Sequence, residues 1–386
     1  MPHRLPTEDI PFDPPPPDEF GAPGPDDLLP DRAVKGRGAV SNRTGRFERE
    51  VRQRTDDGWS RPEVLAEETP PLRTTLADDA TRTIIARNDS PDIPFDRSIN
   101  PYRGCEHGCV YCFARPTHAF LGLSPGLDFE TRLFRKPDAA KLLAAELRRK
   151  GYEPRPIALG ANTDPYQPVE REQRITREVL EVLRDFRHPV GIVTKSHLVT
   201  RDIDILAEMA ADGLAMVSTS ITTLDRDLAR TMEPRAGTPQ RRLDAIRALS
   251  SAGIPTAVLA SPMAPGLNDH EMESILEAAA EAGATYASYI LLRLPLEISG
   301  LFEEWLHAHA PNRAARVLKL IREMRDGQLY QAGFGTRMRG TGPYADLLSR
   351  RFKLACRRLG LNDRRWDLDC GKFRPPPAPG DQLGLF

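Results

Sequence analysis

The chain has 386 residues, a formal net charge of −1 and five cysteines. This length suffices for one large core with appendages, because α/β barrels of about 200–250 residues commonly form one domain. The near-neutral charge gives no overall signal for nucleic acid. Five cysteines do not suggest a disulfide framework, which fits a reducing compartment. Since the N-terminus has no apolar signal core and no run approaches the ~18 apolar residues of a membrane span, we expect a cytoplasmic protein with no membrane partner.

The first 75 residues are predicted to form a largely extended arm. Residues 1–30 are rich in proline and acidic side chains, a composition that favours disorder. Residues 32–54 then carry eight lysine or arginine side chains. Such a segment is suited to contact a phosphate backbone, because those contacts need guanidinium reach more than a fixed fold. The alternative is that the arm packs over the mouth of the folded domain and pairs its arginines with acids there.

Three cysteines lie close together in the stretch 98–118. Cys105, Cys109 and Cys112 are separated by three and then two residues. A short loop with this spacing can turn three thiolates toward one point, as an iron–sulfur cluster or a zinc ion requires. Gly104 and Gly108 flank the first two cysteines, where glycine lets the backbone take positive φ. A cluster held by three cysteines leaves one iron open, which is typical of a catalytic metal.

A structural zinc site is the alternative for the same loop. It would use His107, or the distant Cys356 or Cys370, as the fourth ligand. His118, which follows the loop, is a candidate for tuning the metal. His188, His197 and His270 stand singly near predicted element boundaries, a position typical of surface or capping histidines.

The cysteine motif resembles that of the radical S-adenosylmethionine (radical SAM) superfamily, in which the last cysteine precedes an aromatic residue, here Phe113. The longer sequence around it, Asn-Pro-Tyr-Arg-Gly-Cys with Tyr-Cys-Phe-Ala, resembles the motif of the branch that contains spore photoproduct lyase and its "DNA repair photolyase" relatives. The resemblance implies a [4Fe–4S] cluster on the three cysteines, with S-adenosylmethionine on the open iron and Phe113 beside the cofactor. It also implies reductive cleavage to a 5′-deoxyadenosyl radical that abstracts hydrogen from a substrate, and an electron donor of flavodoxin or ferredoxin type.

From about residue 97 to 295, strand-like and helix-like segments alternate, a pattern typical of a parallel α/β sheet. Six strands are predicted: one before the cysteine loop, then 156–160, 190–194, 214–220, 254–260 and 285–292. Helices are predicted between them, and further helices at 312–326 and 343–359. The resemblance implies an open, partial (β/α)6 TIM-type barrel, which we assign to residues 76–296. In such barrels the chemistry lies at the C-terminal ends of the strands.

Polar residues follow several of these strands. Residues 160–170 form a polar loop with two prolines. By position this loop corresponds to the one that grips the methionine amino group in the superfamily, so Asn162, Thr163 and Asp164 are candidate cofactor ligands. A turn with a helix cap is the alternative. Lys195 ends the third strand, where a buried charge needs an anion. The resemblance suggests the cofactor carboxylate, and a structural ion pair is the alternative.

The later strands add three more candidates. Ser218 and Ser220 end the fourth strand and share one face by alternation, so they are candidates for binding cofactor hydroxyls or carboxylate. Arg293 follows the sixth strand and is a candidate for binding an anionic substrate.

Residues 297–373 are predicted to form a helical extension. Residues 337–374 carry eleven lysine or arginine and four acidic side chains. This second basic zone is suited to flank the barrel mouth and contact nucleic acid. Cys356 and Cys370 are interpreted as structural thiols.

Residues 374–386 form a proline-rich linker and a short tail. Its end, Gln382, Leu383, Leu385 and Phe386 around a glycine, resembles the peptide by which bacterial polymerases and repair factors bind the sliding clamp. A glutamine amide and apolar anchors suit a hydrophobic groove. A tail that folds back onto the barrel is the alternative.

The leading hypothesis is a radical enzyme that acts on nucleic acid, including DNA lesions. Spore photoproduct lyase relies on a cysteine after its second strand, whereas residues 159–163 here contain none. This departure argues against the same reaction by the same route. An RNA- or protein-modifying radical enzyme is a second hypothesis, and a non-catalytic metal-binding adaptor recruited to DNA is a third.

Overall fold

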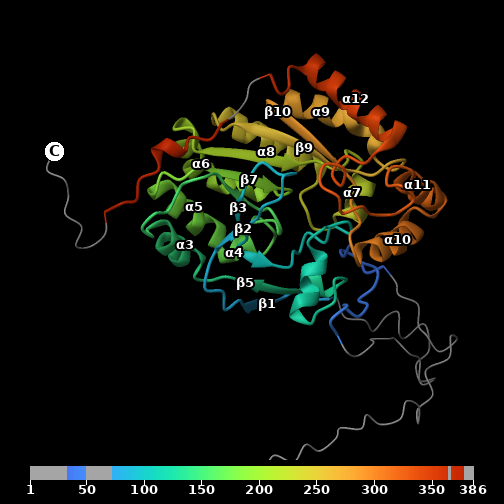
Figure 1. The fold of residues 1–386 in the computed structure, drawn as a ribbon, viewed down its shortest axis with the longest axis horizontal. Coiled ribbons are helices and arrows are strands. Elements are labelled where there is room, and N and C mark those ends of the chain that lie inside the picture. The colour runs from blue at the N-terminus through green and yellow to red at the C-terminus, as the bar shows by residue number, and fades with distance from the viewer. Residues whose placement is uncertain (1–32, 49–71, 364–366, 378–386) are drawn as a thin grey trace, which may run out of the picture. The chain divides into compact units, whose positions relative to one another are not determined.

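The computed structural model describes residues 33–48, 72–363 and 367–377. Six strands pair in parallel in chain order (Figure 1): β3 (Arg97–Ile99), β6 (Ile157–Leu159), β7 (Val190–Thr194), β8 (Ala215–Ser220), β9 (Thr256–Met263) and β10 (Tyr286–Leu291). β2 (Ile85–Arg87) adds an antiparallel edge beside β3. Since β10 and β2 are the two ends of this sheet, the predicted partial (β/α)6 barrel is confirmed.

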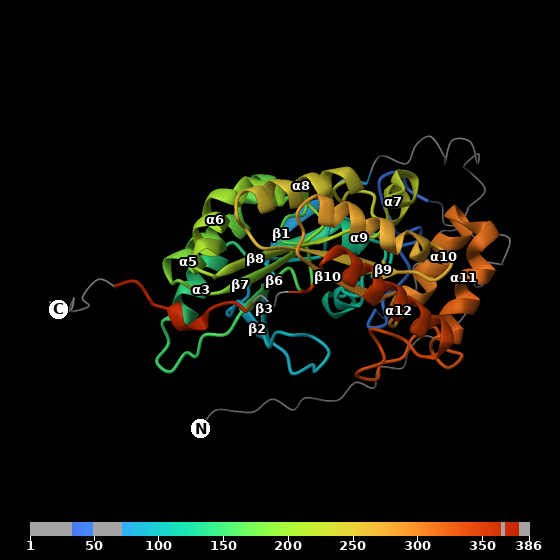
Figure 2. The same ribbon diagram turned by 90° about the horizontal axis from the view of Figure 1, so that it is seen from above.

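Helices cover the outer face of the sheet, and α6, α8 and α9 follow one another along it (Figure 2). The covering helices are α3 (Ala139–Leu147), α4 (Glu170–Gln173), α5 (Ile175–Asp185), α6 (Ile203–Ala211), α7 (Arg226–Met232), α8 (Pro239–Ser251) and α9 (Met272–Glu281). α5 is typical of them, because Ile175, Val179, Leu180 and Leu183 recur on one helical face and are buried. β6 is buried at all three residues, whereas β7 alternates buried and half-buried residues, so its second face is less covered.

A second, small sheet carries the cysteine loop. It contains β1 (Thr75–Asp78), β5 (Arg132–Arg135) and β4 (Tyr102–Arg103), in that order. Between β4 and β5 lie the cysteines, the 3₁₀ helix η2 (Arg115–Leu121) and α2 (Asp128–Thr131). The sequence analysis predicted no such sheet, because its strands have two to four residues and no clear alternation. The sheet fixes both ends of the cysteine loop.

The C-terminal extension contains α10 (Ile298–His309), α11 (Pro311–Glu323) and α12 (Gly342–Leu359). α10 was not predicted. Its Trp305 is fully buried and donates to the carbonyl of Thr231 at 2.9 Å, so this helix is tied to α7. α12 packs along α9 (Figure 1), where Arg351 forms an ion pair with Glu273. Short 3₁₀ turns, η3 (His197–Asp202), η4 (Asp269–Glu271) and η5 (Cys370–Lys372), complete the described part.

Residues 367–377 pack at the N-terminal ends of the barrel strands. Phe373 lies against Tyr152, Phe186 and His188. His188 is fully buried, donates to or accepts from Tyr152 OH at 2.8 Å, and bonds the carbonyl of Pro189, so the prediction of a surface histidine is wrong. Its aromatic neighbours come from distant parts of the chain, and a sequence pattern does not reveal them. Among the described residues, no helix has both the length and the apolar character to cross a membrane.

Candidate active site

The cysteine loop follows β3 and lies at the C-terminal end of the parallel strands. Cys105 and Cys109 are buried and Cys112 is half-buried. Gly104 and Gly108 have φ of 75° and 66°. A Cβ at Gly104 would come within 2.6 Å of Leu133, and one at Gly108 within 2.7 Å of the Glu130 carboxylate. Both positions therefore require glycine for conformation and for space.

Arg115 holds this loop from within. Its guanidinium is fully buried and donates to the carbonyls of Gly108 at 3.1 Å and Cys109 at 2.8 Å. It also donates to the carbonyls of Pro125 and Gly126 and forms a 2.5 Å ion pair with the buried Glu130. A buried ion pair costs free energy of desolvation unless all of its hydrogen-bond donors have acceptors. Here all the N–H donors of the Arg115 guanidinium have one. The sequence analysis missed Arg115, although its position three residues after Cys112 was visible.

Gln167 holds the other side of the loop. Its side chain is fully buried, accepts from the N–H of Glu106 at 2.9 Å and donates to the carbonyl of Gly104 at 3.2 Å. His107 directs Nδ1 toward Asp164, 3.3 Å from Oδ2, rather than standing free as a fourth ligand. The loop after β6 therefore supports the cysteine loop. Gln167 lay in the polar loop singled out from sequence but was not chosen.

The thiols fit an iron–sulfur cluster chemically. Burial raises the pKa of Cys105 well above its usual value and also raises the pKa of Cys109 and Cys112. A thiolate in this setting needs a cationic partner, which a cluster supplies. Within the part of the chain that the structure describes, no three histidine, cysteine or acidic side chains are grouped for a single metal ion.

His118 is buried beside Gly104, and its Nε2 lies 2.9 Å from the carbonyl of Arg132.

Asp164 ties three loops together. Its carboxylate accepts from Thr194 Oγ1 at 2.8 Å, from the N–H of Lys195 at 2.7 Å and from the N–H of Tyr166 at 2.9 Å. Burial works to raise the pKa of Asp164, but His107 and these hydrogen bonds outweigh it and the pKa is lowered. An ionised Asp164 thus braces the site.

The other two candidates in this loop differ in how their side chains are used. Thr163 donates to the carbonyl of Tyr102 at 2.9 Å, so its hydroxyl is occupied within the protein. The backbone N–H groups of Asn162 and Thr163 both donate to Asn100 Oδ1, and the side chain of Asn162 is half-buried. Asn162 is therefore the member of the trio whose side chain is left for a ligand within the described structure.

Lys195 and Ser220 meet at the ends of β7 and β8. Lys195 Nζ donates to Ser220 Oγ at 2.7 Å, and Ser218 is buried on the same face of β8. Burial lowers the pKa of Lys195. Its nearest carboxylate is Glu233, with Nζ 3.7 Å from Oε1. The predicted cofactor residues therefore lie together, and Lys195 already has a protein anion within reach.

Glu233 is the third site residue that sequence reasoning missed. It is fully buried after α7 and accepts hydrogen bonds from Tyr111, Thr222 and Arg242. Burial raises the pKa of its carboxyl, although Arg242 opposes this. Tyr111 lies between Cys109 and Cys112 in the chain, so Glu233 connects the fourth strand to the cysteine loop. No sequence spacing links residue 111 to residue 233.

The predicted basic arm is used partly within the fold. Arg37 is buried and donates to the carbonyls of Glu130 and Leu72, at 3.0 and 2.5 Å. Arg43 pairs with Glu304, and Arg46 pairs with Glu297. Arg43 and Arg46 therefore follow the alternative, in which the arm pairs with acids of the folded domain, whereas Arg37 is held by backbone carbonyls. Arg32, Arg49, Arg52 and Arg54 lie outside the described residues.

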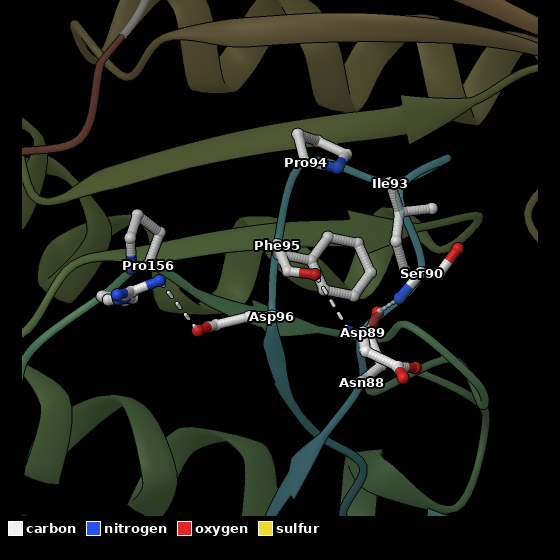
Figure 3. Close-up of a pocket in the computed structure, with 9 residues that line it drawn as sticks. Asn88, Asp89, Ser90, Ile93, Pro94, Phe95, Asp96 and Pro156 are labelled. Atoms are coloured by element: carbon white, nitrogen blue, oxygen red, sulfur yellow. Dashed lines mark hydrogen bonds and ion pairs between the residues drawn. The ribbon is translucent and has the colours of Figure 1, made fainter.

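A surface depression of about 330 Å³ lies elsewhere (Figure 3). It is lined by the loop before β3 and by Arg155 and Pro156, which precede β6. Asp96 and Pro156 directly precede β3 and β6, so this side of the depression lies at the N-terminal ends of those strands, whereas the cysteine loop follows β3. We therefore assign the depression no part in the chemistry.

The fold and the cysteine loop define a member of the radical SAM superfamily: the family model for that superfamily matches residues 99–279. The chain belongs to this superfamily and is a radical SAM enzyme, and the family implies a [4Fe–4S] cluster and S-adenosylmethionine. Among its relatives, an uncharacterized protein of Mycobacterium tuberculosis is 38% identical over 232 residues, which are 60% of this chain and 68% of that protein. An uncharacterized protein of Methanocaldococcus jannaschii is 29% identical over 173 residues, 45% of this chain and 62% of its own.

Solved structures of spore photoproduct lyase share the fold. The complex with dinucleoside spore photoproduct gives a TM-score of 0.55 at 15% identity, over 74% of this chain and 80% of that one. A mutant of spore photoproduct lyase in which one cysteine is replaced by serine gives 0.52 at 16% identity over the same shares. At this identity the similarity establishes the fold and not the reaction.

Proposed function

We propose that this radical SAM enzyme abstracts hydrogen from a nucleic-acid substrate, in particular a DNA lesion. The observation that carries the proposal is the buried cysteine loop, fixed by Arg115 and Gln167 at the C-terminal ends of six parallel strands. The substrate class is supported by the fold shared with a lyase whose structure holds a dinucleoside spore photoproduct.

In this proposal Cys105, Cys109 and Cys112 hold the cluster. When bound, the cluster and S-adenosylmethionine supply a 5′-deoxyadenosyl radical. Asn162, Lys195, Ser218 and Ser220 bind the polar ends of the cofactor, while Asp164 keeps their loops in place. Phe113, which follows the last cysteine and is 47% exposed, lies beside the cofactor in this proposal. Electrons come from a flavodoxin- or ferredoxin-type donor.

The test is an anaerobic reconstitution with iron and sulfide, followed by dithionite and S-adenosylmethionine. We expect 5′-deoxyadenosine from the wild type and none from Cys109→Ala. Ultraviolet-irradiated DNA should then increase 5′-deoxyadenosine formation over unirradiated DNA of the same sequence. A rate that no DNA changes, but that RNA or protein fractions raise, would replace the substrate class. Failure to form any 5′-deoxyadenosine with a full cluster would favour the adaptor hypothesis.

We also propose that the tail binds the sliding clamp through Gln382, Leu383, Leu385 and Phe386, which lie outside the described residues. Support comes from where the chain leaves the fold. The N–H of Arg374 donates to the carbonyl of Phe186 at 2.9 Å, and Phe186 precedes β7. Arg374, at the start of this segment, therefore lies at the end of the barrel opposite the cysteine loop. A labelled peptide of residues 374–386 should bind the clamp, and a peptide with Leu385 and Phe386 replaced by alanine should not; equal binding of the two would reject the motif.

A further inference from the structure

A cluster of aromatic rings and guanidinium groups lies beside the cysteine loop. β3 leads into that loop near one end of the main sheet, and β10 is the other end. Arg293 follows β10, and its Cζ lies 5.6 Å from the ring centroid of Phe113, the residue after Cys112. This contact therefore joins the two sides of the open barrel at its mouth.

The guanidinium of Arg293 is only partly used. An arginine has five N–H donors. Arg293 reaches Met338 Sδ at 3.3 Å and the hydroxyl of Tyr330 at 3.5 Å, while its Nε is buried and has no hydrogen-bond partner among the described residues. The N–H of Gly335 and the Arg337 guanidinium hold the Asp92 carboxylate and lower its pKa, and Arg293 adds only a smaller contribution. A half-buried cation with spare donors is suited to an anionic ligand.

Two further rings come from residues 327–342, a segment with five glycines. The ring centroid of Tyr330 lies 6.0 Å from Arg293 Cζ. Phe334 is 60% exposed, with Arg337 Cζ 4.6 Å from its ring, and Phe113 is 47% exposed. Single exposed phenylalanines are common on protein surfaces. Rings interleaved with arginines are the arrangement by which proteins stack bases and hold the phosphates of single strands.

The segment that carries Phe334 is anchored to the opposite end of the sheet. Asp92 and Ser90, in the loop between β2 and β3, hold the Arg337 guanidinium. That loop is itself braced by Asn88, which donates to the carbonyl of Phe95 at 2.9 Å (Figure 3) and accepts from the N–H of Ser90 at 3.1 Å. The two arginines and their rings are thus held in place before any ligand binds, which lowers the entropic cost of binding.

We propose that Phe113, Tyr330, Phe334, Arg293 and Arg337 form a binding site for an unstacked nucleotide of single-stranded or base-flipped DNA. The rings stack on the base, and Arg293 donates its free N–H groups to the phosphate. The choice of a nucleic-acid ligand rests on the proposed function. The site deepens that function by placing the base next to the residue that follows Cys112.

The test measures DNA binding by the full chain with its cluster reconstituted and without reductant. The probe is a fluorescein-labelled dT 12-mer, and binding is followed by anisotropy at two salt concentrations. We expect Phe334→Leu and Tyr330→Leu each to weaken binding roughly tenfold, as the loss of one base–aromatic stack does. Because Phe334 is exposed, its replacement leaves the core intact. Leu354→Ala, at an equally exposed position on α12, and Arg247→Gln, at an exposed position on α8 outside both basic zones, are the controls and should change the affinity less than twofold.

The outcomes separate this site from the proposed function. If the wild type binds the oligonucleotide and neither ring variant weakens binding, the site is wrong even when DNA stimulates 5′-deoxyadenosine formation. If both variants weaken binding but no DNA affects that reaction, the site stands and the proposed substrate falls. A wild type that binds no single-stranded DNA, or binds the matching RNA more tightly, overturns the assignment to DNA.

Discussion

The side chains of Arg115 and Glu130 form an ion pair at 2.5 Å, and neither is exposed to solvent. Arg115 also holds the carbonyls of Gly108 and Cys109, while Glu130 accepts from the N–H groups of Gly38 and Ala39. One buried pair thus connects the cysteine loop to α2 and to the segment at residues 33–48. We therefore expect cluster binding by the cysteine loop to depend on this pair.

Arg115→Met should therefore impair both stability and cluster retention. Removing one partner of a buried ion pair costs about 3–5 kcal/mol, because the other charge is left uncompensated. We expect a lower urea midpoint for the protein and a marked loss of the iron–sulfur absorbance after reconstitution. Arg247→Met is the control, since Arg247 pairs with Asp244 at the surface and is 56% exposed. Full iron content in Arg115→Met would show that the loop does not need this support.

Gly108→Ala should prevent cluster assembly, whereas Gly122→Ala should not. Both glycines have φ of 66°, so alanine has the same conformational cost, on the order of 1 kcal/mol, at each. A Cβ at Gly108 meets the Glu130 carboxylate at 2.7 Å, but a Cβ at Gly122 meets nothing within 4 Å. Iron and sulfide analysis of the two proteins isolates the clash. Equal iron content would mean that the Glu130 side chain can move aside.

Lys195→Met tests whether this lysine binds the cofactor or only neutralises Glu233. A hydrogen bond to a charged group is worth about 1.5–3 kcal/mol, so loss of a cofactor contact should raise the KM for S-adenosylmethionine at least tenfold. The readout is 5′-deoxyadenosine formation against cofactor concentration. Lys319→Met, at a position 77% exposed on α11, should leave the KM unchanged. If Lys195→Met loses stability but keeps the wild-type KM, the lysine serves the Glu233 pair alone.

His188 should make folding stability sensitive to acid. Burial lowers the pKa of His188 to about 4, whereas an unfolded histidine has a pKa near 6.5. Its contribution is therefore full above pH 6.5 and is lost as pH falls toward 4, by up to about 3 kcal/mol at the lower end. Urea unfolding of wild type and His188→Gln between pH 4 and 7 measures this difference. His270→Gln, at an exposed position, should follow the wild-type curve; parallel curves for all three proteins would contradict the prediction.

Much of the fold was predictable because its signals are local. The parallel strands appear as apolar runs between amphipathic helices, and β7 agrees with the predicted range 190–194. α10 was missed because its residues 298–309 mix apolar side chains with acids and histidines, and its buried face is defined by contact with α7. The small sheet of β1, β5 and β4 was missed because its pairing joins segments that are distant in the sequence, such as Thr75 with Arg132.

The sequence by itself indicated the chemical class of this protein, because the spacing of Cys105, Cys109 and Cys112 along one short loop is a local property and their motif resembles that of the radical SAM superfamily. It also placed Lys195 and Ser220 at strand ends, where the parallel topology brings them together. Only the tertiary structure decided what surrounds the loop. Arg115, Gln167 and Glu233 act through buried hydrogen bonds to residues that are distant in sequence, and burial is a property of the folded chain. For the same reason, the contact between Phe113 and Arg293, which come from the two sides of the open barrel, exists only in the folded chain.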